Sequence, residues 1–316
     1  MRDMQSVEFR DVKVFYGENS LKALKSLNLR DALIVTTRSL LNSPLIDEIK
    51  KLTGNPMVMR GPSQHTPKEE LDELMNRIEG KSVISVGGGS VIDSIKISFP
   101  RLHVAIPTTL SGAEHTSVAG YTEGGLKVSV NVKPPDVVIL DPWVLSFTPK
   151  SLLVTTSFRA LDHAIEANYS VKATPFTDAL ALKGYEYLVD CLENENFGLC
   201  QIGSWLSSLS FQYAGRGLSH VFGYVFGPAF GIPHGVTSCI SLVQAIKFNG
   251  IFKIPNVVES LEGILRKYDI TEKLSKYTTL ENALKYAKVF ADLTNKSENP
   301  KKITIEDAEN FIKSVY

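Results

Sequence analysis

Short apolar runs alternate with segments of helical periodicity through the first 140 residues, and this alternation constrains the fold more than any other feature. The predicted strands are residues 12–16, 32–36, 57–59, 82–86, 103–106 and 137–140. The predicted helices between them are residues 18–26, 44–52 and 67–78, the last with Thr66 as its N-terminal cap. Such alternation predicts an α/β domain, in which a parallel sheet carries helices on both faces.

The pattern changes after residue 110. Residues 118–121 and 126–130 flank Glu123-Gly124-Gly125, which predicts a β-hairpin with a glycine turn. Beyond Pro149 strand patterns nearly vanish, and apolar residues recur at helical spacing, as at positions 179, 182, 185 and 188. We therefore predict two domains, an α/β domain over residues 1–149 and an all-helical domain over residues 150–316.

Charge and hydropathy exclude several classes of partner. The chain has 34 basic and 34 acidic residues and no basic block, so nucleic acid is not an expected partner. No stretch approaches the roughly 20 apolar residues of a membrane-spanning helix, and residues 1–10 lack the apolar core of a signal peptide. We expect a cytoplasmic protein without a membrane partner. Cys191, Cys200 and Cys239 fit neither a disulfide framework nor a zinc site, so we expect buried or inert thiols in a reducing compartment.

Three consecutive glycines, Gly87, Gly88 and Gly89, precede Ser90 between a predicted strand and a predicted helix. Glycines let a backbone approach a phosphate closely, and a helix N-terminus presents unpaired N–H groups. Each glycine costs about 1 kcal/mol of backbone entropy relative to alanine, and three are more than a turn requires. The loop therefore predicts a site for a phosphorylated ligand, although its spacing is neither the Rossmann nor the P-loop pattern. The alternative is a plain turn, with Ser90 and Asp93 at the spacing of a capping box.

A second polar loop, from Pro107 through Thr108, Thr109 and Ser111, also follows a predicted strand. Ligands of open α/β sheets bind at the carboxyl ends of the strands, where both loops are expected. Taken alone, this second loop fits a binding role and a purely structural role equally well.

Three histidines, His163, His220 and His234, lie in the predicted helical domain. Arg159 precedes His163 by four residues, so the two share a helix face. The surroundings of His220 are apolar and rich in glycine, which indicates burial. Three neutral imidazoles would suit a divalent metal, but each histidine alone is better explained as a hydrogen-bonded core or surface side chain.

Taken in order, four segments resemble the iron-containing alcohol dehydrogenase superfamily, which has the dehydroquinate synthase-like fold. Residues 87–96 resemble its cofactor pyrophosphate loop, and residues 107–114 resemble its Pro-Thr-Thr loop. Residues 160–166 resemble the helix that carries two metal ligands, and His220 and His234 reproduce the spacing of the other two. The resemblance implies that residues 1–149 bind a dinucleotide, NAD or NADP, and that residues 150–316 carry the substrate or metal site across a cleft.

The resemblance also implies the cofactor-binding residues. They are Thr36, Thr37, Gly87, Gly88, Gly89, Ser90, Asp93, Thr108, Thr109, Ser111 and Lys127. An acidic residue near Thr37 would favour NAD, but Thr37 and Arg38 stand here, so NAD and NADP both stay open. Within the superfamily the maleylacetate reductase branch looks most similar, on residues 64–67 and 122–127.

Two departures from the family pattern bear on the chemistry. Arg159 stands where the metal-dependent members carry an aspartate, and Tyr224 stands where they often carry a further histidine. Asp162 precedes His163 by about 100° of helix rotation, so we expect it to face elsewhere. A guanidinium at the metal position would repel a dication, because even two unit charges 4 Å apart interact by about 4 kcal/mol at an effective dielectric of 20. The hypothesis is a metal-free site in which Arg159 replaces the cation. In the alternative, Arg159 bends away to solvent and the three histidines still hold iron or zinc.

The resemblance then implies an NAD(P)-dependent oxidoreductase that transfers a hydride between nicotinamide and a small carbonyl, alcohol or keto-acid substrate. The catalytic residues would be Arg159, His163, His220, Tyr224 and His234, with Tyr224 as a proton donor. The alternatives are a metal-dependent alcohol dehydrogenase with Fe or Zn on His163, His220 and His234, a lyase related to dehydroquinate synthase, and a degenerate dinucleotide-binding paralogue without turnover. The resemblance also suggests a homodimer.

Overall fold

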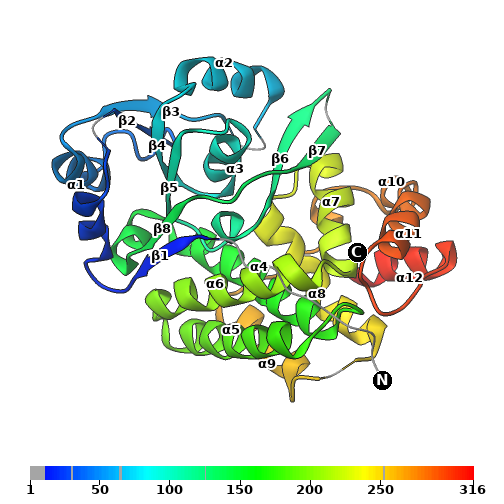
Figure 1. Ribbon diagram of the computed structural model, residues 1–316. Coiled ribbons are helices and arrows are strands. Elements are labelled where there is room, and N and C mark those ends of the chain that lie inside the picture. Colours follow the sequence, from blue (N-terminus) through cyan, green and yellow to red (C-terminus); the bar gives the residue numbers. More distant parts are fainter. Residues whose placement is uncertain (1–10, 30, 64–65, 125, 252) are drawn as a thin grey trace.

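The computed structural model describes residues 11–29, 31–63, 66–124, 126–251 and 253–316. The predictions on residues 1–10 and the resemblance carried by Gln64 and His65 lie outside these residues. The predicted fold class is confirmed, since a six-stranded parallel α/β sheet is followed by a helical half. Figure 1 shows the sheet with its helices around it in the upper part of the molecule, and the helical half below and to the right.

All six strands of the main sheet run parallel, in the order β1-β8-β5-β4-β2-β3. The strands are β1 (Lys13–Tyr16), β2 (Ala32–Thr36), β3 (Met57–Arg60), β4 (Ser82–Gly87), β5 (Leu102–Pro107) and β8 (Val137–Leu140). Every residue of β2, β4 and β8 is buried. This is why these strands are continuous apolar runs instead of alternating ones, as expected for a sheet covered on both faces.

The strand order reverses between β2 and β4. From β2 the chain adds β3 on one side, then returns to place β4 and β5 on the other side. In open α/β sheets the loops at such a reversal diverge and leave a crevice at the carboxyl ends of the strands. The loops that follow β2 and β4 begin at Thr37 and Gly88, so the predicted phosphate loop stands at this crevice.

The helices of the first half match the predictions except at two points. They are η1 (Ser20–Ser26), α1 (Pro44–Thr53), α2 (Lys68–Ile78) and α3 (Gly89–Ile97). The first is a short 3-10 helix instead of an α-helix over residues 18–26. The predicted cap Thr66 is wrong, because Pro67 is the residue that precedes α2. Thr66 has a φ of 50°, and its hydroxyl donates to the carbonyl oxygen of Ser90 at 3.3 Å.

The predicted hairpin is confirmed as a separate two-stranded antiparallel sheet. Its strands are β6 (Val118–Glu123) and β7 (Leu126–Asn131). Strand β6 contacts α3, and β7 contacts α7 (Leu218–Phe230) of the helical half. The hairpin therefore spans the gap between the sheet and the helices, as Figure 1 shows.

Strands end at Leu140, and the helical half begins with α4 (Lys150–Tyr169). Besides α4 and α7, the α-helices of this half are α5 (Pro175–Asn194), α6 (Phe197–Ala214), α8 (His234–Asn249), α9 (Val257–Lys267), α10 (Leu280–Leu284), α11 (Ala287–Lys296) and α12 (Ile305–Val315). Helix α4 is central, since it packs against α5, α6 and α8 and is buried without a break from Thr156 to Tyr169. Among the described residues, no helix is long and apolar enough to cross a membrane.

The expectation of three free thiols is wrong, because Cys191 and Cys200 form a disulfide. Helices α5 and α6 are joined through only Glu195 and Asn196. This short connection brings the end of one helix against the start of the next, with the two cysteine Cα atoms 5.5 Å apart. Cys239 is free and buried. The cysteine content therefore no longer supports a reducing compartment.

Candidate active site

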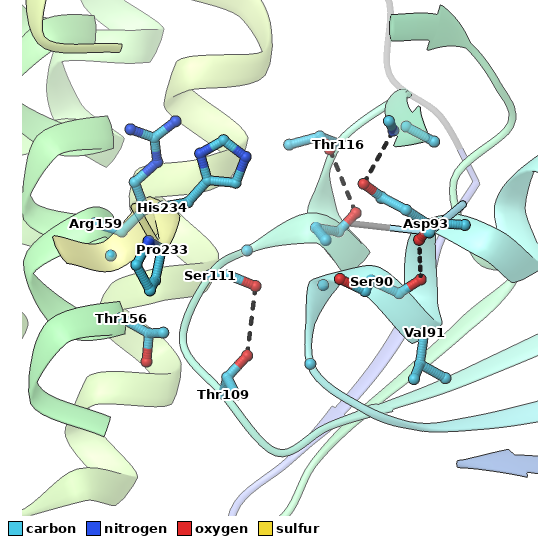
Figure 2. Close-up of a pocket in the computed structure, with 18 of the residues that line it drawn as sticks. Ser90, Val91, Asp93, Thr109, Ser111, Thr116, Thr156, Arg159, Pro233 and His234 are labelled. Atoms are coloured by element: carbon cyan, nitrogen blue, oxygen red, sulfur yellow. Dashed lines mark hydrogen bonds between the residues drawn. The ribbon is translucent and has the colours of Figure 1, made fainter. Parts of the chain in front are cut away.

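A cavity of about 800 Å³ lies between the carboxyl ends of the parallel strands and the helical half. Ser90, Thr109 and Ser111 line it on the sheet side, opposite Arg159 and His234 on the helical side (Figure 2). Every residue predicted to be catalytic lines this cavity. Of the predicted cofactor-binding residues it is lined by Thr37, Gly88, Gly89, Ser90, Asp93, Thr108, Thr109 and Ser111.

Two predicted cofactor residues, Thr36 and Gly87, do not line the cavity. The Thr36 side chain is buried in the sheet, where its hydroxyl donates to the carbonyl oxygen of Val86 at 2.8 Å. Gly87 stands just behind the cavity wall, with a φ of 155° that few other residues adopt. The Lys127 side chain lies outside the described part of the chain.

The glycines of the phosphate loop are packed against the second polar loop. A Cβ on Gly88 would lie 3.2 Å from the Thr109 hydroxyl oxygen, and a Cβ on Gly89 would lie 3.1 Å from that of Ser111. Gly88 and Gly89 also begin α3, which has no side-chain cap. The N–H groups of its first turn are therefore open to the cavity, and glycine is the residue that keeps this space clear.

Asp93 does not cap α3, so the capping-box alternative is wrong. One oxygen of Asp93 accepts from the Gly120 N–H at 3.1 Å, and the other pairs with Lys96 at 2.8 Å. Lys96 is 2% exposed, and its ammonium also donates to the carbonyl oxygens of Ala113 and Val118, both at 2.7 Å. This buried lysine ties α3 to the second loop and to the hairpin, which holds the two cavity loops in register.

His163 and His220 face each other at the helical end of the cavity. Their rings stack with centroids 4.9 Å apart, and the Phe211 ring stacks on His220 at 4.3 Å. His163 Nδ1 lies 3.0 Å from the hydroxyl of Ser208. Burial, followed by the charges of His220 and Arg159, holds the pKa of His163 well below its usual value. His163 is therefore neutral at physiological pH.

Glu166, which was not predicted, orients His220. Its two oxygens accept from the backbone N–H groups of Gly217 and Ser219 at 2.6 and 2.7 Å, and from the Tyr169 hydroxyl at 3.1 Å. One of them also lies 2.7 Å from His220 Nδ1. Because Nδ1 is engaged in this way, His220 Nε2 is left buried with no hydrogen-bond partner among the described residues. An orphaned imidazole nitrogen at a cavity wall is available to a ligand.

Asp162, which was expected to face elsewhere, lies in the same buried cluster, against His220 and two serines. One oxygen lies 3.3 Å from His220 Nδ1, and the other accepts from the Ser219 and Ser238 hydroxyls at 2.8 and 2.7 Å. Burial alone would raise its pKa, but the neighbouring His220 and Arg159 lower the pKa of Asp162. Asp162 and Glu166 are four residues apart and therefore share a helix face, and this spacing is the sequence pattern that could have identified both as part of the site.

Arg159 does not bend away to solvent. Its side chain is 9% exposed, and Nη1 lies 3.1 Å from the Ser238 hydroxyl and 3.4 Å from an Asp162 oxygen. A Cβ on Gly223 would come within 3.5 Å of the same nitrogen, so glycine leaves room for the guanidinium beside α7. The alternative of an exposed Arg159 is therefore wrong.

Tyr224 lies one turn after His220 on α7, close to the ring of His234 with centroids 6.3 Å apart. Arg216 was not predicted, and its guanidinium carbon lies 5.0 Å above the centre of the Tyr224 ring. A basic residue between Gly215 and Gly217, just ahead of the helix of His220, was the only sequence signal for it.

Asp162, Glu166 and His220 could together hold a metal ion, since their ligand atoms lie within 4.8 Å of one another. This group differs from the predicted set of three histidines. Its oxygens already accept six of the hydrogen bonds described above, and the buried guanidinium of Arg159 stands against Asp162. The three histidines that the family resemblance implies as metal ligands also line the same cavity as the Arg159 guanidinium. These residues fit a dication poorly, because a like charge and occupied lone pairs both oppose it.

Comparison with known families covers nearly the whole chain. The model described as iron-containing alcohol dehydrogenase matches residues 12–142, and that of the C-terminal part of the Fe-containing alcohol dehydrogenase family matches residues 153–316. The 1-propanol dehydrogenase PduQ of Citrobacter freundii is 32% identical over 75% of this chain and 72% of its own. Maleylacetate reductase 1 of Rhodococcus opacus is 32% identical over 69% of this chain and 66% of its own.

Solved structures share the fold. Maleylacetate reductase from Agrobacterium tumefaciens superposes with a TM-score of 0.86 at 20% identity and covers 99% of both chains. An iron-containing alcohol dehydrogenase from Corynebacterium glutamicum superposes with a TM-score of 0.82 at 22% identity, covering 98% of this chain and 97% of that one. At these identities the likeness establishes the fold alone.

Proposed function

Because this chain belongs to the iron-containing alcohol dehydrogenase family, a family of dehydrogenases and reductases, we propose that it is an NAD(P)-dependent oxidoreductase acting on a carbonyl or alcohol substrate that carries a carboxylate. The relatives divide between a propanol dehydrogenase and maleylacetate reductases, so similarity alone leaves the substrate open. The observation that carries the proposal is the buried guanidinium of Arg159 in the same cavity wall as His163 and His220.

The sheet side of the cavity fits a dinucleotide. The side-chain-free surface of Gly88 and Gly89 and the open first turn of α3 suit a diphosphate, and a cavity of about 800 Å³ is large enough for much of a dinucleotide. Thr37, at the end of β2, would lie toward the adenosine ribose. When bound, the nicotinamide ring would accept or supply the hydride.

Arg159 would supply the positive charge that a metal supplies in metal-dependent relatives. Its guanidinium stays charged at any physiological pH. Because the site is buried, its effective dielectric is low, and this strengthens the attraction of the guanidinium for an anion. It would hold the substrate carboxylate or polarise the carbonyl oxygen, and Asp162 and Ser238 would fix its direction. No step of this scheme needs a metal.

Two groups on α7 would handle the proton of the reacting oxygen. His220 Nε2 is unpaired in the described part of the chain and its ring is fixed by Glu166 and Phe211, so it can accept a hydrogen bond from the hydroxyl of the alcohol form of the substrate. Tyr224, one turn further along, would donate the proton that the new alkoxide requires. Neutral His163 would complete the wall beside His220 without adding a charge.

A metal-dependent alcohol dehydrogenase is the second candidate, and the group of Asp162, Glu166 and His220 is the observation in its favour. The two candidates differ in what Arg159 does. In the first it binds substrate, and in the second it would only neutralise Asp162.

The test combines cofactor binding with turnover. Titration with NADH and NADPH should give a saturable fluorescence change, and 2-oxo acids should be reduced more efficiently than aldehydes of equal length. Arg159→Met should lower kcat/KM for the acids by about 10- to 100-fold relative to aldehydes, because a hydrogen bond to a charged group is lost, and Arg159→Lys should retain part of it. Cofactor binding without turnover on acids, aldehydes or alcohols would instead support a degenerate paralogue, and absence of cofactor binding would refute the proposal.

A further inference from the structure

The cavity contains a second cation that the proposed reaction does not use. Arg216 lies in the short segment between α6 and α7 and lines the same cavity as Arg159. Gly223 and Tyr224 are neighbours on α7, about 100° apart around the helix. Arg159 packs beside Gly223, and Arg216 lies over the Tyr224 ring. Both guanidinium groups therefore contact α7, the helix that carries His220.

The backbone of Arg216 is held in place. Its N–H donates to a Glu298 oxygen at 3.2 Å, and the preceding Gly215 has a φ of 82° with Glu298 against its Cα. Burial would raise the pKa of Glu298, but the Lys172 ammonium at 2.8 Å and the Arg216 N–H lower it, so this carboxylate stays charged. Since Lys172 already pairs with it, Glu298 anchors the Arg216 backbone without neutralising the guanidinium.

The guanidinium itself is stacked but unpaired. It lies over the Tyr224 ring, and across the described ranges it has no ion pair and no side-chain hydrogen bond. Stacking on an aromatic face leaves the N–H groups at the edge of the guanidinium free for an acceptor in the plane. Lys296, exposed at the end of α11, adds a second positive charge to the same cavity, also without an ion pair within the described part of the chain.

We propose that Arg216, positioned by Tyr224, binds a second anionic group of the substrate, a carboxylate or a phosphate monoester, at the end remote from Arg159. This inference rests on the proposed function, in which Arg159 binds the first carboxylate. Substrates with an acidic group at both ends are then preferred over those with one. Arg216 is a specificity-determining residue, and Lys296 draws the same anion toward the cavity through its charge.

The experiment compares matched substrates that differ at one end only. The pairs are 2-oxobutanoate with 2-oxobutanedioate, 2-oxopentanoate with 2-oxopentanedioate, and 2-oxohexanoate with 2-oxohexanedioate, together with a phosphate-terminated 2-oxo acid. At the length that spans both arginines, the doubly acidic compound should have a kcat/KM about tenfold or more above its monoacid. Arg216→Gln should reduce this ratio toward one, Arg216→Lys should restore part of it, and the exposed Arg266→Gln on α9 should leave it unchanged. The better of the carboxylate and phosphate ends identifies the anion.

A binding measurement separates this inference from the proposed function. Calorimetry of succinate, glutarate and adipate, each against the monocarboxylate of equal length, reports on Arg216 even if no compound is turned over. Tighter binding of a dicarboxylate that disappears in Arg216→Gln supports the inference, even where turnover fails and the proposed function falls. Equal kcat/KM within every pair, or an equal loss for both members in Arg216→Gln, overturns the inference while leaving the reductase activity intact.

Discussion

Replacement of Gly112 by alanine tests how tightly the loop after β5 is packed against the histidine cluster. Gly112 has a φ of 74°, and a Cβ there would lie 1.8 Å from the Ser208 hydroxyl oxygen and 2.7 Å from the Ser208 Cβ. Ser208 is fully buried, and its hydroxyl is the partner of His163 Nδ1 at 3.0 Å. The new methyl group therefore cannot be accommodated unless Ser208 moves and releases His163.

The cost has two parts. Alanine in the left-handed region costs roughly 1–2 kcal/mol, and overpacking of a buried site costs roughly 1–3 kcal/mol. Gly112→Ala should therefore destabilise the protein by about 2–5 kcal/mol. Gly54→Ala is the matched control, because Gly54 has a φ of 83° but nothing within 4 Å of its Cβ position. The control should show only the first part.

Urea unfolding of each variant gives these free energies, and a double-mutant cycle with Ser208→Gly isolates the contact. In the Ser208→Gly background, Gly112→Ala should cost no more than Gly54→Ala, because both colliding atoms are gone. Turnover should also fall in Gly112→Ala, since His163 loses its partner. Equal destabilisation by Gly112→Ala and Gly54→Ala, or strict additivity in the cycle, would refute the reasoning.

Three further changes test the cofactor loop, the sheet and the metal question. Thr37→Asp should raise the NADH-to-NADPH ratio of kcat/KM by about tenfold, because a carboxylate repels the ribose phosphate; an unchanged ratio would place the ribose elsewhere. Burial lowers the pKa of His103 to about 3. Below pH 6.5 the unfolded chain therefore binds a proton that the folded chain does not, and the free energy of unfolding decreases as the pH is lowered. Between pH 7 and 5 the wild type should lose about 2 kcal/mol more free energy of unfolding than His103→Gln, and equal losses would contradict this. Protein purified without chelator should contain well under one equivalent of Fe or Zn by elemental analysis, and Arg159→Asp should raise that content; a full equivalent in the wild type would contradict the metal-free site.

The two loops on the sheet side could be predicted because their signals are local. Three glycines after an apolar run imply a close backbone approach wherever the chain folds, and parallel strands bring their carboxyl ends to one edge. The hairpin at residues 118–131 was equally readable from its glycine turn. Thr36 was misplaced because residues adjacent in a strand point to opposite faces, and only the sheet shows which face is covered.

The helical side was predicted only in outline. Arg159, His163, His220, Tyr224 and His234 were all identified and all line the cavity, but their catalytic roles stay predictions. The pattern contained no information on how α4, α6 and α7 cross. The contact of Glu166 with His220 and the stacking of Arg216 on Tyr224 depend on those crossings.

The sequence by itself determined the succession of strands and helices and the position of the glycine loop, because hydrophobic periodicity and backbone freedom are properties of neighbouring residues. Tertiary structure alone decided which side chains meet. The disulfide between Cys191 and Cys200 and the pairing of Arg159 with Asp162 both depend on helix ends and faces being brought together. The residue type sets the charge of Arg159, but the strength of its interaction depends on distance, so packing decides whether this charge opposes a metal at the site.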